Sequence, residues 1–517
     1  MSSVNTDARW ITYMQAACAL TGAFIFIYVV GGVLYRLYLS PLAKFPGPKL
    51  AGATLWYEFY YDNICKGQYT FKIKELHEKY GPIIRISPYE LHVNDPDFYE
   101  VLYSQHSPRN KYYYFTKQFD LPLSAFGTED HNVHRLRRGV MNPFFSKQRI
   151  SRLEPVIQAQ VQKLCERIID FNKANAAVPI SLGFSCLTTD IITEYVMTQS
   201  FHYLDAPDWL PQWPKTLQST AETGIMAKQI PGIIPFLKSL PESWIEAMDP
   251  GMGLFFRFTK KCEEQIKDIM QNKEEMKRIA QDKMSTQPTL FHEILDSKLP
   301  PEEKTSARLG QELHGVVGAG TETTSGVLTF ALYYLLRNPE KLERLKNEIN
   351  ELEPDKNVQL NLKDLEQLPY LTSVILEALR LNYGVSTRLQ RISPNEALQF
   401  QDYTIPPGTP VGMTSVLMHH NESIFPDSYS FVPERWLDAS ERKRLEKYMV
   451  SFSKGSRQCV GMNLARAEMF ITIATILRKF DFELHNTTDD DIVLKHDLFL
   501  PRPKNLDSNG AYVIVKN

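Results

Sequence analysis

A chain of 517 residues with 43% hydrophobic and 23% charged residues has the composition of a large globular protein with room for an extensive core. Its formal net charge of −2 gives no overall basic field, which argues against nucleic acid as a partner. The six cysteines are scattered without a CxxC pair or a zinc-ligand spacing. We therefore expect reduced thiols in a cytosolic setting rather than a disulfide framework.

An uncharged stretch at residues 14–35 is long enough to cross a bilayer as one helix. Positive residues are in excess on its C-terminal side, which predicts that this side is cytosolic. A cleaved signal peptide is disfavoured because the apolar region is too long, whereas a buried helix of a soluble domain stays open. We predict a membrane anchor over residues 1–36, a stiff proline-rich hinge over 37–50 and one large domain over 51–517.

The first part of the large domain mixes a helix, short strands and an aromatic loop. Residues 68–79 have the pattern of a short amphipathic helix. Residues 83–86 and 90–93 alternate around a Ser-Pro turn, which predicts a hairpin. Residues 112–126 are rich in aromatic side chains. These side chains either contact a ligand or simply pack under a loop.

The middle of the chain is predicted to be mostly helical. A helix begins near His131, and helical patterns continue over residues 147–197. The proline-rich segment 206–244 contains an apolar cluster at 230–237, which either dips into lipid or packs as a tucked turn. Residues 260–283 are heavily charged and predict a solvated helix.

A long apolar helix is predicted over residues 313–336, and a new helix begins at Pro339. Four glycines interrupt the apolar helix, and each weakens it by about 1 kcal/mol relative to alanine. Close approach of a ligand is one reason to keep them. Within it, Glu322 and Thr323 pair an acid with an alcohol, which suits proton delivery. The alternative is a Ser/Thr-rich kink with a surface glutamate.

Glu377 and Arg380 lie three residues apart in an amphipathic helix predicted at 371–382, which places them on one face. Arg435 follows in a Pro-Glu-Arg-Trp segment. A third partner would complete a buried ion pair that is costly when half satisfied. The alternative is an ordinary exposed pair worth roughly 0.2–0.5 kcal/mol.

Residues 452–461 read Phe-Ser-Lys-Gly-Ser-Arg-Gln-Cys-Val-Gly, and an apolar helical run follows from Met462 to about Phe480. A thiolate at Cys459, just ahead of a helix N-terminus, is stabilised by the helix dipole and free backbone N–H groups. The glycines let the backbone approach something flat or bulky. This is the chemistry of a cysteine that ligates haem iron; an inert structural cysteine is the alternative.

This stretch resembles the haem-binding signature of the cytochrome P-450 family, the haem-thiolate monooxygenases. The matching positions are Phe452, Gly455, Arg457, Cys459 and Gly461. The resemblance implies a mainly α fold with a small β component, preceded by one transmembrane helix. It also implies that residues 51–517 form a haem-thiolate catalytic domain that binds haem b with Cys459 as the axial iron ligand.

The same resemblance implies roles for the residues above. Glu322 and Thr323 would be catalytic and manage protons, whereas Glu377, Arg380 and Arg435 would form a structural scaffold for the cysteine loop. The haem propionates would be held by four basic side chains: His134, Arg138, Arg388 and Arg457. Arg391 is the alternative to Arg388, and for His134 the alternative is a role on the surface. Residues 112–126 would form a variable substrate-contacting loop, and residues 498–501 would add a second substrate-facing loop.

The implied activity inserts one oxygen atom of O2 into an apolar small molecule. Residues 387–391 and 419–426 resemble fungal members of the trichodiene-oxygenase type, which implies a terpenoid or polyketide intermediate of secondary metabolism. Electrons would come from NADPH through a separate cytochrome P-450 reductase, and we hypothesise that Arg135 and Arg137 dock this acidic donor. The implied location is the endoplasmic reticulum membrane, with lipid as a partner and the catalytic domain cytosolic.

Two other functions stay open from the sequence. One is a haem-thiolate isomerase or dehydratase that works without O2, which the Glu322–Thr323 pair disfavours. The other is a haem-binding sensor or carrier, which the apolar loops disfavour.

Overall fold

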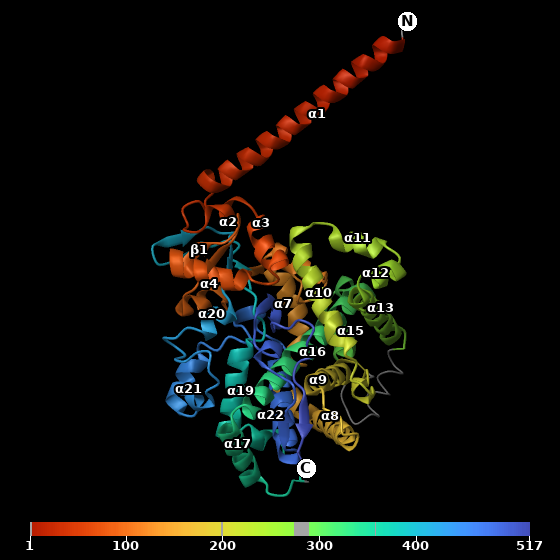
Figure 1. Cartoon of the computed structure of the whole chain (residues 1–517), viewed down its shortest axis with the longest axis vertical. Helices are drawn as coiled ribbons and strands as arrows, with labels where there is room; N and C mark the ends of the chain where they lie inside the picture. Colours follow the sequence, from red (N-terminus) through yellow and green to blue (C-terminus); the bar gives the residue numbers. More distant parts are fainter. Residues whose placement is uncertain (1–2, 198–199, 273–288, 357, 517) are drawn as a thin grey trace.

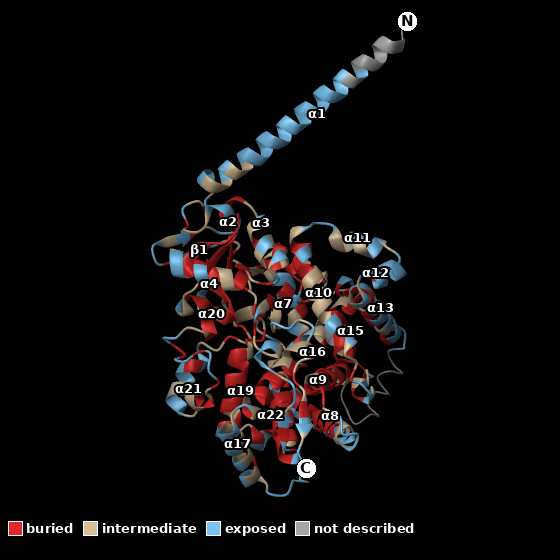
Figure 2. Ribbon diagram, viewed as in Figure 1, coloured by how far each residue is buried: buried red, intermediate tan, exposed pale blue. Residues whose placement is uncertain are grey.

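The computed structural model describes residues 3–197, 200–272, 289–356 and 358–516. Helix α1 (Ser3–Leu34) and the π-helical turn η1 (Tyr35–Leu39) project from the body like a stalk (Figure 1). The most apolar 18-residue stretch within Thr12–Leu39 has a mean hydropathy of 2.2, and none of it is buried, as the exposed surface in Figure 2 shows. The prediction of one N-terminal apolar helix long enough to span a membrane is confirmed.

The base of the stalk is docked on the body. The Arg85 guanidinium donates to the carbonyl of Arg36 at 2.7 Å, and the Arg85 N–H donates to the carbonyl of Pro46 at 2.7 Å. Leu42 and Phe45 are buried in a core cluster. Residues 42–46 of the segment 37–50 therefore pack on the body, and the stiff hinge predicted there stays a prediction.

The body is mainly helical, which confirms the predicted fold class. Within the predicted helical region 147–197, the segment 174–179 separates α8 (Lys147–Lys173) from α9 (Ile180–Val196), and this turn lets α9 pack on α8. The helices are α2 (Lys49–Ala53), α3 (Trp56–Phe59), α4 (Tyr69–Tyr80), α5 (Tyr99–Leu102), α6 (Tyr113–Thr116), α7 (His131–Met141), α8 (Lys147–Lys173), α9 (Ile180–Val196), α10 (Gln212–Gln229), α11 (Ile233–Ser239), α12 (Glu242–Met248), α13 (Pro250–Gln271), α15 (Leu290–Asp296), α16 (Ser306–Leu336), α17 (Pro339–Leu352), α18 (Leu362–Leu365), α19 (Pro369–Asn382), α20 (Ser415–His419), α21 (Ala439–Glu446) and α22 (Met462–Lys479).

The β component is small, and its largest sheet lies near the base of the stalk, where Figure 1 labels β1 (Ile83–Arg85). The predicted hairpin is present: β1 (Ile83–Arg85) pairs antiparallel with β2 (Leu91–Val93), and Ile84 lies opposite His92. One sheet has the order β1 (Ile83–Arg85), β2 (Leu91–Val93), β7 (Pro410–Gly412), β4 (Arg391–Ile392) and β3 (Asn110–Lys111). Three two-stranded antiparallel sheets are also present: β5 (Leu398–Phe400) with β6 (Tyr403–Ile405), β8 (Phe482–Leu484) with β11 (Val513–Val515), and β9 (His496–Leu498) with β10 (Leu500–Arg502).

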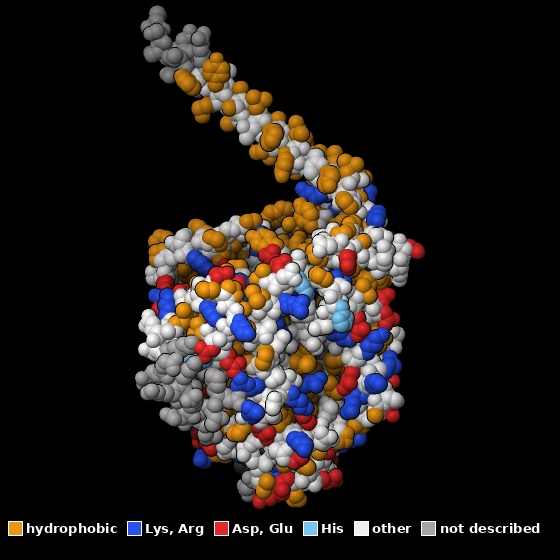
Figure 3. Space-filling view, turned by 180° about the vertical axis from the view of Figure 1, so that it is seen from behind, with side chains coloured by type: hydrophobic (Ala, Val, Ile, Leu, Met, Phe, Trp, Pro, Cys, Tyr) orange, Lys and Arg blue, Asp and Glu red, His pale blue; other side chains and the backbone are white. Residues whose placement is uncertain are grey.

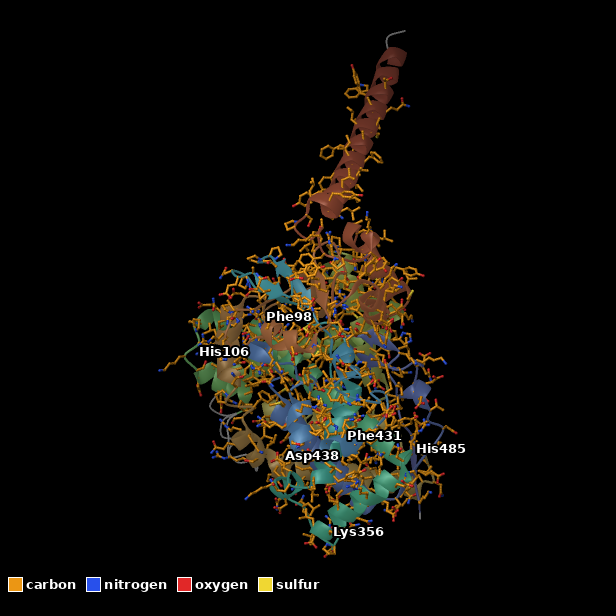
Figure 4. All side chains as sticks on the ribbon, turned by 90° about the vertical axis from the view of Figure 1, so that its left-hand side faces the viewer. Phe98, His106, Lys356, Phe431, Asp438 and His485 are labelled. Carbon is orange, nitrogen blue, oxygen red and sulfur yellow. The ribbon has the colours of Figure 1, made fainter. Side chains whose placement is uncertain are left out.

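Helix α16 runs through the centre of the body and packs against α9, α13, α19 and α22 (Figure 1). It begins seven residues before the predicted start, at Ser306, where the Thr305 hydroxyl caps it by accepting from the Arg308 N–H. Its C-terminal half is fixed from outside as well: Phe431, labelled in Figure 4, stacks on Tyr334 with ring centroids 5.3 Å apart. The central position of α16 exposes one of its faces to the internal cavity described below.

The glycines of α16 serve two different purposes. A side chain at Gly320 would lie 2.8 Å from Ile192, so this glycine permits close packing of α16 on α9. A side chain at Gly318 would meet nothing within 4 Å. The expectation that the glycines keep room for a ligand therefore fits Gly318 but needs correction for Gly320. Of the charged helix predicted over 260–283, the part up to Gln271 lies in α13, and 273–288 lies outside the described residues.

Candidate functional site

A cavity of about 400 Å³ lies inside the body. Its walls come from α7, α10, α16 and α22, the aromatic segment before α7, the loop ahead of α22 and the β9–β10 hairpin. Most predicted site residues line it: His134, Arg138, Glu322, Thr323, Arg457 and Cys459. Residues from distant parts of the sequence thus converge on one internal space.

Cys459 sits on one wall with its side chain open to the cavity. Its N–H donates to the carbonyl of Phe452 at 2.9 Å, which closes the loop that carries the thiol. Gly455 has φ +74°, and a side chain there would collide with the Tyr103 carbonyl, so the loop requires glycine at this position. The loop delivers the thiol to the cavity in a fixed position.

The predicted thiolate needs an ion to hold its charge. Burial raises the pKa of the Cys459 thiol, although the Gly461 N–H and Arg138 oppose that rise. Coordination to a metal cation deprotonates a thiol outright. The site suits a cysteine that is a ligand rather than a free nucleophile.

A cluster of basic side chains lines the same cavity beside the cysteine loop. It contains two atoms that are buried without a hydrogen-bond partner, His134 Nδ1 and Arg457 Nε. Among the residues that the structure describes, none of its members makes a salt bridge to a carboxylate. The cluster consists of Lys111, His134, Arg138, Arg391 and Arg457.

Burial, reinforced by the proximity of the other cations, depresses the basicity of this cluster. Burial, with Arg391 adding, lowers the pKa of Arg457 to about 9, and burial lowers the pKa of Lys111 well below its usual value. Uncompensated buried cations are costly. A ligand with two negative groups would relieve this cost.

Lys111 was missed by sequence reasoning. It stands at the start of an aromatic run, and no spacing pattern marked it. The backbone bonds of β3 to β4 set Lys111 opposite Arg391 and so bring it to the cavity.

Arg388 is not part of this cluster. Its guanidinium is fully buried and engaged by two carboxylates, with Nη2 at 2.8 Å from Glu58 and Nε at 2.7 Å from Glu90. The predicted propionate role of Arg388 is therefore corrected in favour of Arg391, the alternative. Arg391 lines the cavity, and within the described part of the chain its side chain donates to backbone carbonyls alone.

The opposite wall is α16, where Glu322 and Thr323 both line the cavity. Arg502 on β10 holds the Glu322 carboxylate, with Nη2 at 2.9 and 3.0 Å from its two oxygens. The Thr323 hydroxyl donates to the Ala319 carbonyl at 2.8 Å, one turn back. The acid and the alcohol are adjacent, as predicted, but the acid is paired with an arginine that sequence reasoning missed.

Glu468 on α22 is a second carboxyl group on the cavity wall. Burial raises its pKa well above the ordinary value, while a hydrogen bond with Thr324 opposes the rise. Burial thus favours the protonated form of this carboxyl group. A lone acid inside the apolar run 462–480 was the sequence signal for it.

The aromatic part of the cavity joins two segments predicted to face a substrate. Phe119 and Phe126 from the loop 112–126 lie 4.8 Å apart, and Phe119 and Phe499 lie 4.7 Å apart between ring centroids. Edge-to-face contacts of this kind favour a rigid wall. This end of the cavity is suited to apolar and aromatic molecules.

Glu377, Arg380 and Arg435 come together beneath the cysteine loop. Arg380 donates twice to Glu377, at 2.8 and 2.9 Å, and Arg435 Nε lies 3.2 Å from the same carboxylate. Trp436 Nε1 donates to Glu377 at 2.9 Å. The network is buried and every oxygen of Glu377 is bonded, as a stable buried ion pair requires.

Two hydrogen bonds through His419 link this network to the cysteine loop. Arg380 Nη1 donates to the His419 carbonyl at 2.9 Å, and the Val450 N–H donates to His419 Nε2 at 3.0 Å. Val450 lies two residues before Phe452, where the cysteine loop begins. The geometry is that of a support for this loop.

Arg137 does not face the solvent. It is buried, and its guanidinium donates to both oxygens of Glu303 at 2.7 and 2.9 Å. The hypothesis that Arg135 and Arg137 together dock an electron donor is corrected, because only Arg135 is exposed.

An exposed apolar surface lies below the stalk, where Figure 3 shows hydrophobic side chains gathered at the top of the body. The segment 230–237 contributes to this surface, because Phe236 is 60% exposed. Of the two alternatives for this segment, the tucked turn is therefore wrong. We call the large exposed apolar side chains of this surface the apolar rim; they are Leu50, Trp56, Ile64, Phe236, Trp244 and Met248.

Comparisons with known proteins agree with this geometry. The family model described as Cytochrome P-450 matches residues 46–507. Cytochrome P-450 monooxygenase MO6277 of Ascocoryne sarcoides is 48% identical over 96% of this chain and 98% of its own length. Tryptophan 6-hydroxylase fscE of Fusarium equiseti is 41% identical over 96% of this chain and 97% of its length.

N-acetyltryptophan 6-hydroxylase ivoC of Emericella nidulans is 38% identical over 96% of both chains. Among solved structures, a crystal structure of the cytochrome P-450 CYP102L1 superimposes with a TM-score of 0.68, covers 87% of this chain and 95% of that chain, and is 18% identical in sequence. At that identity the likeness shows the fold alone.

Proposed function

The chain belongs to the cytochrome P-450 family and is a monooxygenase, and we propose that it binds haem b through Cys459 and oxygenates an apolar product of fungal secondary metabolism. One observation carries the proposal. The cavity sets a lone cysteine on one wall, the adjacent Glu322 and Thr323 on the wall formed by α16, and basic side chains without carboxylate partners beside the cysteine.

The residues present fit a haem. Cys459 would ligate the iron, and the buried basic cluster would hold the two propionates, which supply the anions that this cluster lacks. The partnerless atoms His134 Nδ1 and Arg457 Nε are the donors that such carboxylates would engage. Glu377, Arg380 and Arg435 would keep the cysteine loop in place.

Haem held by a cysteine thiolate supplies the activation of O2. The chain itself has to deliver protons and exclude water. The Thr323 hydroxyl can pass a proton at Oγ1, and Glu322 beside it can replenish that proton. The carboxyl of Glu468 on α22, whose protonated form burial favours, is a second group in the cavity that can donate a proton. The packed rings of Phe119 and Phe499 keep bulk water from the reacting carbon.

The proposed substrate is a small, largely apolar molecule, such as a terpenoid, a polyketide or an indole. The aromatic wall supports this class. The relatives named for tryptophan and N-acetyltryptophan hydroxylation add the indole to the terpenoid and polyketide classes expected from the sequence.

We propose that electrons come from NADPH through a membrane-bound cytochrome P-450 reductase and that the protein resides in the endoplasmic reticulum membrane with its body in the cytosol. The N-terminal apolar helix and the apolar rim support attachment to lipid. In this orientation the glycosylation sequons at Asn421 and Asn486 stay unmodified. Glycans found on either asparagine would show that the orientation is the opposite one.

The experiment is reconstitution of the full chain with haem and a fungal reductase. The reduced CO complex should show the red-shifted Soret band of thiolate-ligated haem, and Cys459→Ala should abolish the band. NADPH and O2 should be consumed with oxygenated product from a panel of terpenoids, polyketides and indoles. Product formed without NADPH or O2 would instead indicate an isomerase.

A further inference from the structure

His314 is a polar side chain on the cavity wall, far from the proposed oxygen-activating residues. It precedes Glu322 by eight residues, about 12 Å along α16, and residues at four-residue steps share a helix face. Gly318, between them, also lines the cavity. A molecule lying along this face would therefore have its reactive end near Glu322 and its far end near His314.

The hydrogen bonds of His314 determine which ring nitrogen carries the proton. Its Nδ1 lies 3.2 Å from the Thr259 hydroxyl oxygen. That hydroxyl already donates its only proton to the Phe255 carbonyl at 3.0 Å, so it can only accept from the histidine. Nδ1 therefore carries the hydrogen, and Nε2 is left as an acceptor.

Nε2 has no hydrogen-bond partner among the residues that the structure describes. The ring is held in place by the edges of Phe255 and Phe258, at 4.7 and 5.2 Å between ring centroids. Burial lowers the pKa of His314 to about 4, so the ring is neutral under physiological conditions. The cavity thus contains a rigid, neutral acceptor in an aromatic setting.

The charged groups near this end are already paired. Glu312 is bonded to Arg308 at 2.8 Å and accepts from the Ala125 N–H at 3.0 Å. Lys238 pairs with Asp120. A substrate carboxylate at this end of the cavity would face the lone pair of Nε2. It would have no unpaired cation beside it among the described residues, and burying such an anion is costly.

We propose that His314 Nε2 accepts a hydrogen bond from a neutral hydroxyl or N–H group on the substrate, so that this enzyme selects uncharged molecules with a donor at the end remote from the oxidised carbon. This inference rests on the proposed function, because it uses the haem-binding wall as the reference for the reactive end. It predicts a neutral alcohol or an indole N–H rather than a free amino acid carboxylate as the recognised group.

Binding to haem-loaded enzyme tests the proposal without knowledge of the substrate. The probes are 1-alkylimidazoles with tails of graded length that end in a methyl, a hydroxyl or a carboxylate group. The imidazole anchors every probe at the iron, and the shift of the Soret band gives the dissociation constant. At the tail length that reaches His314, the hydroxyl probe should bind about three- to tenfold more tightly than the methyl probe. The carboxylate probe should bind more weakly than both.

Variants at the site give the second arm. His314→Phe keeps the ring and removes the acceptor, so the preference for the hydroxyl tail should disappear, and His314→Gln should restore part of it. Thr259→Val removes the acceptor that keeps the hydrogen on Nδ1, so the ring can adopt the other tautomer and the preference for the hydroxyl tail should fall. Val316→Ala, on the same wall, should change all three affinities alike.

The outcomes separate this inference from the proposed function. Tightest binding of the carboxylate tail, or an unchanged hydroxyl preference in His314→Phe at every length, overturns the inference alone. Absence of any Soret shift with the methyl-tailed probe means that there is no accessible haem and overturns the proposed function itself.

Discussion

Arg502 Nη2 lies 2.9 and 3.0 Å from the two carboxylate oxygens of Glu322, so the acid of the proposed proton pathway is held by the hairpin that also carries Phe499. Contact between a substrate and Phe499 therefore acts on the strand that positions the acid. Arg502 is a positioning residue in this arrangement.

The first prediction concerns coupling of electron use to product. Arg502→Gln should lower the product formed per NADPH about tenfold, with peroxide replacing product, because Glu322 loses its orientation. Arg502→Lys should retain part of the coupling. The measurement is the ratio of product to NADPH consumed, with the CO difference band as a check that haem is bound. Unchanged coupling in Arg502→Gln would show that the pair is only structural.

The second prediction concerns the Glu377 network. Glu377→Ala removes a carboxylate that accepts from Arg380, Arg435 and Trp436, which leaves buried cations unpaired. Breaking a buried pair of this kind costs about 3–5 kcal/mol, a large part of the stability of a folded domain. We expect little haem-loaded protein, measured as the CO band per mole of chain. Glu434→Gln, in the same segment but at a partly exposed pair with Lys341, is the control and should cost less than about 1 kcal/mol.

The third prediction separates two neighbouring arginines. Arg391→Leu should speed haem loss several-fold in a folded protein, because Arg391 faces the cavity. Arg388→Leu should instead destabilise the fold, because Glu58 and Glu90 would be left buried without their shared cation. Haem transfer to apomyoglobin and thermal unfolding measure the two effects. Rapid haem loss from a fully stable Arg388→Leu would restore the original assignment.

These two arginines show where prediction from sequence stopped. Cys459 and the partners Glu377, Arg380 and Arg435 were found because a local motif or a helical spacing marked each of them. Arg388 and Arg391 lie three residues apart in extended chain, where residues at odd spacing point to opposite sides. Only one of them can face the cavity, and the sequence does not say which side the cavity occupies.

The residues that were missed reach the site through tertiary structure. Lys111 is placed by the pairing of β3 with β4, and Arg502 by the β9–β10 hairpin. His314 was inside a predicted helix, but its tautomer depends on Thr259 of another helix. The helices themselves were predictable from apolar periodicity, with starts and breaks displaced where caps and packing decide them.

The fourth prediction concerns the apolar rim. If it rests in the bilayer, brominated lipids should quench the fluorescence of Trp56 and Trp244 in the full chain in nanodiscs, since both are more than 60% exposed. Trp244→Phe should remove part of the quenchable signal, whereas Trp436→Phe should not change it because Trp436 is fully buried. Equal quenching in the wild type and Trp244→Phe would place α12 outside the membrane.

The fifth prediction concerns Asp62, which is buried beside Lys228, a residue of α10 that lies 3.3 Å away. Burial raises the pKa of Asp62 to about 6, while Lys228 opposes and Glu58 adds to this rise. A carboxyl group with a higher pKa in the folded chain binds its proton more tightly there. Its contribution therefore favours folding at low pH and is lost as pH rises from about 4 to about 6, by up to about 3 kcal/mol.

Asp62→Asn removes this titration without removing the side-chain volume. The Tm of the variant relative to the wild type should therefore rise across that pH interval and level off above it. Asp97→Asn is the matched control, because its side chain is 75% exposed and should shift Tm little at any pH. A difference in Tm between Asp62→Asn and the wild type that stays constant from about pH 4 to about pH 7 would contradict the assignment, because a group with unequal folded and unfolded pKa values must couple stability to pH.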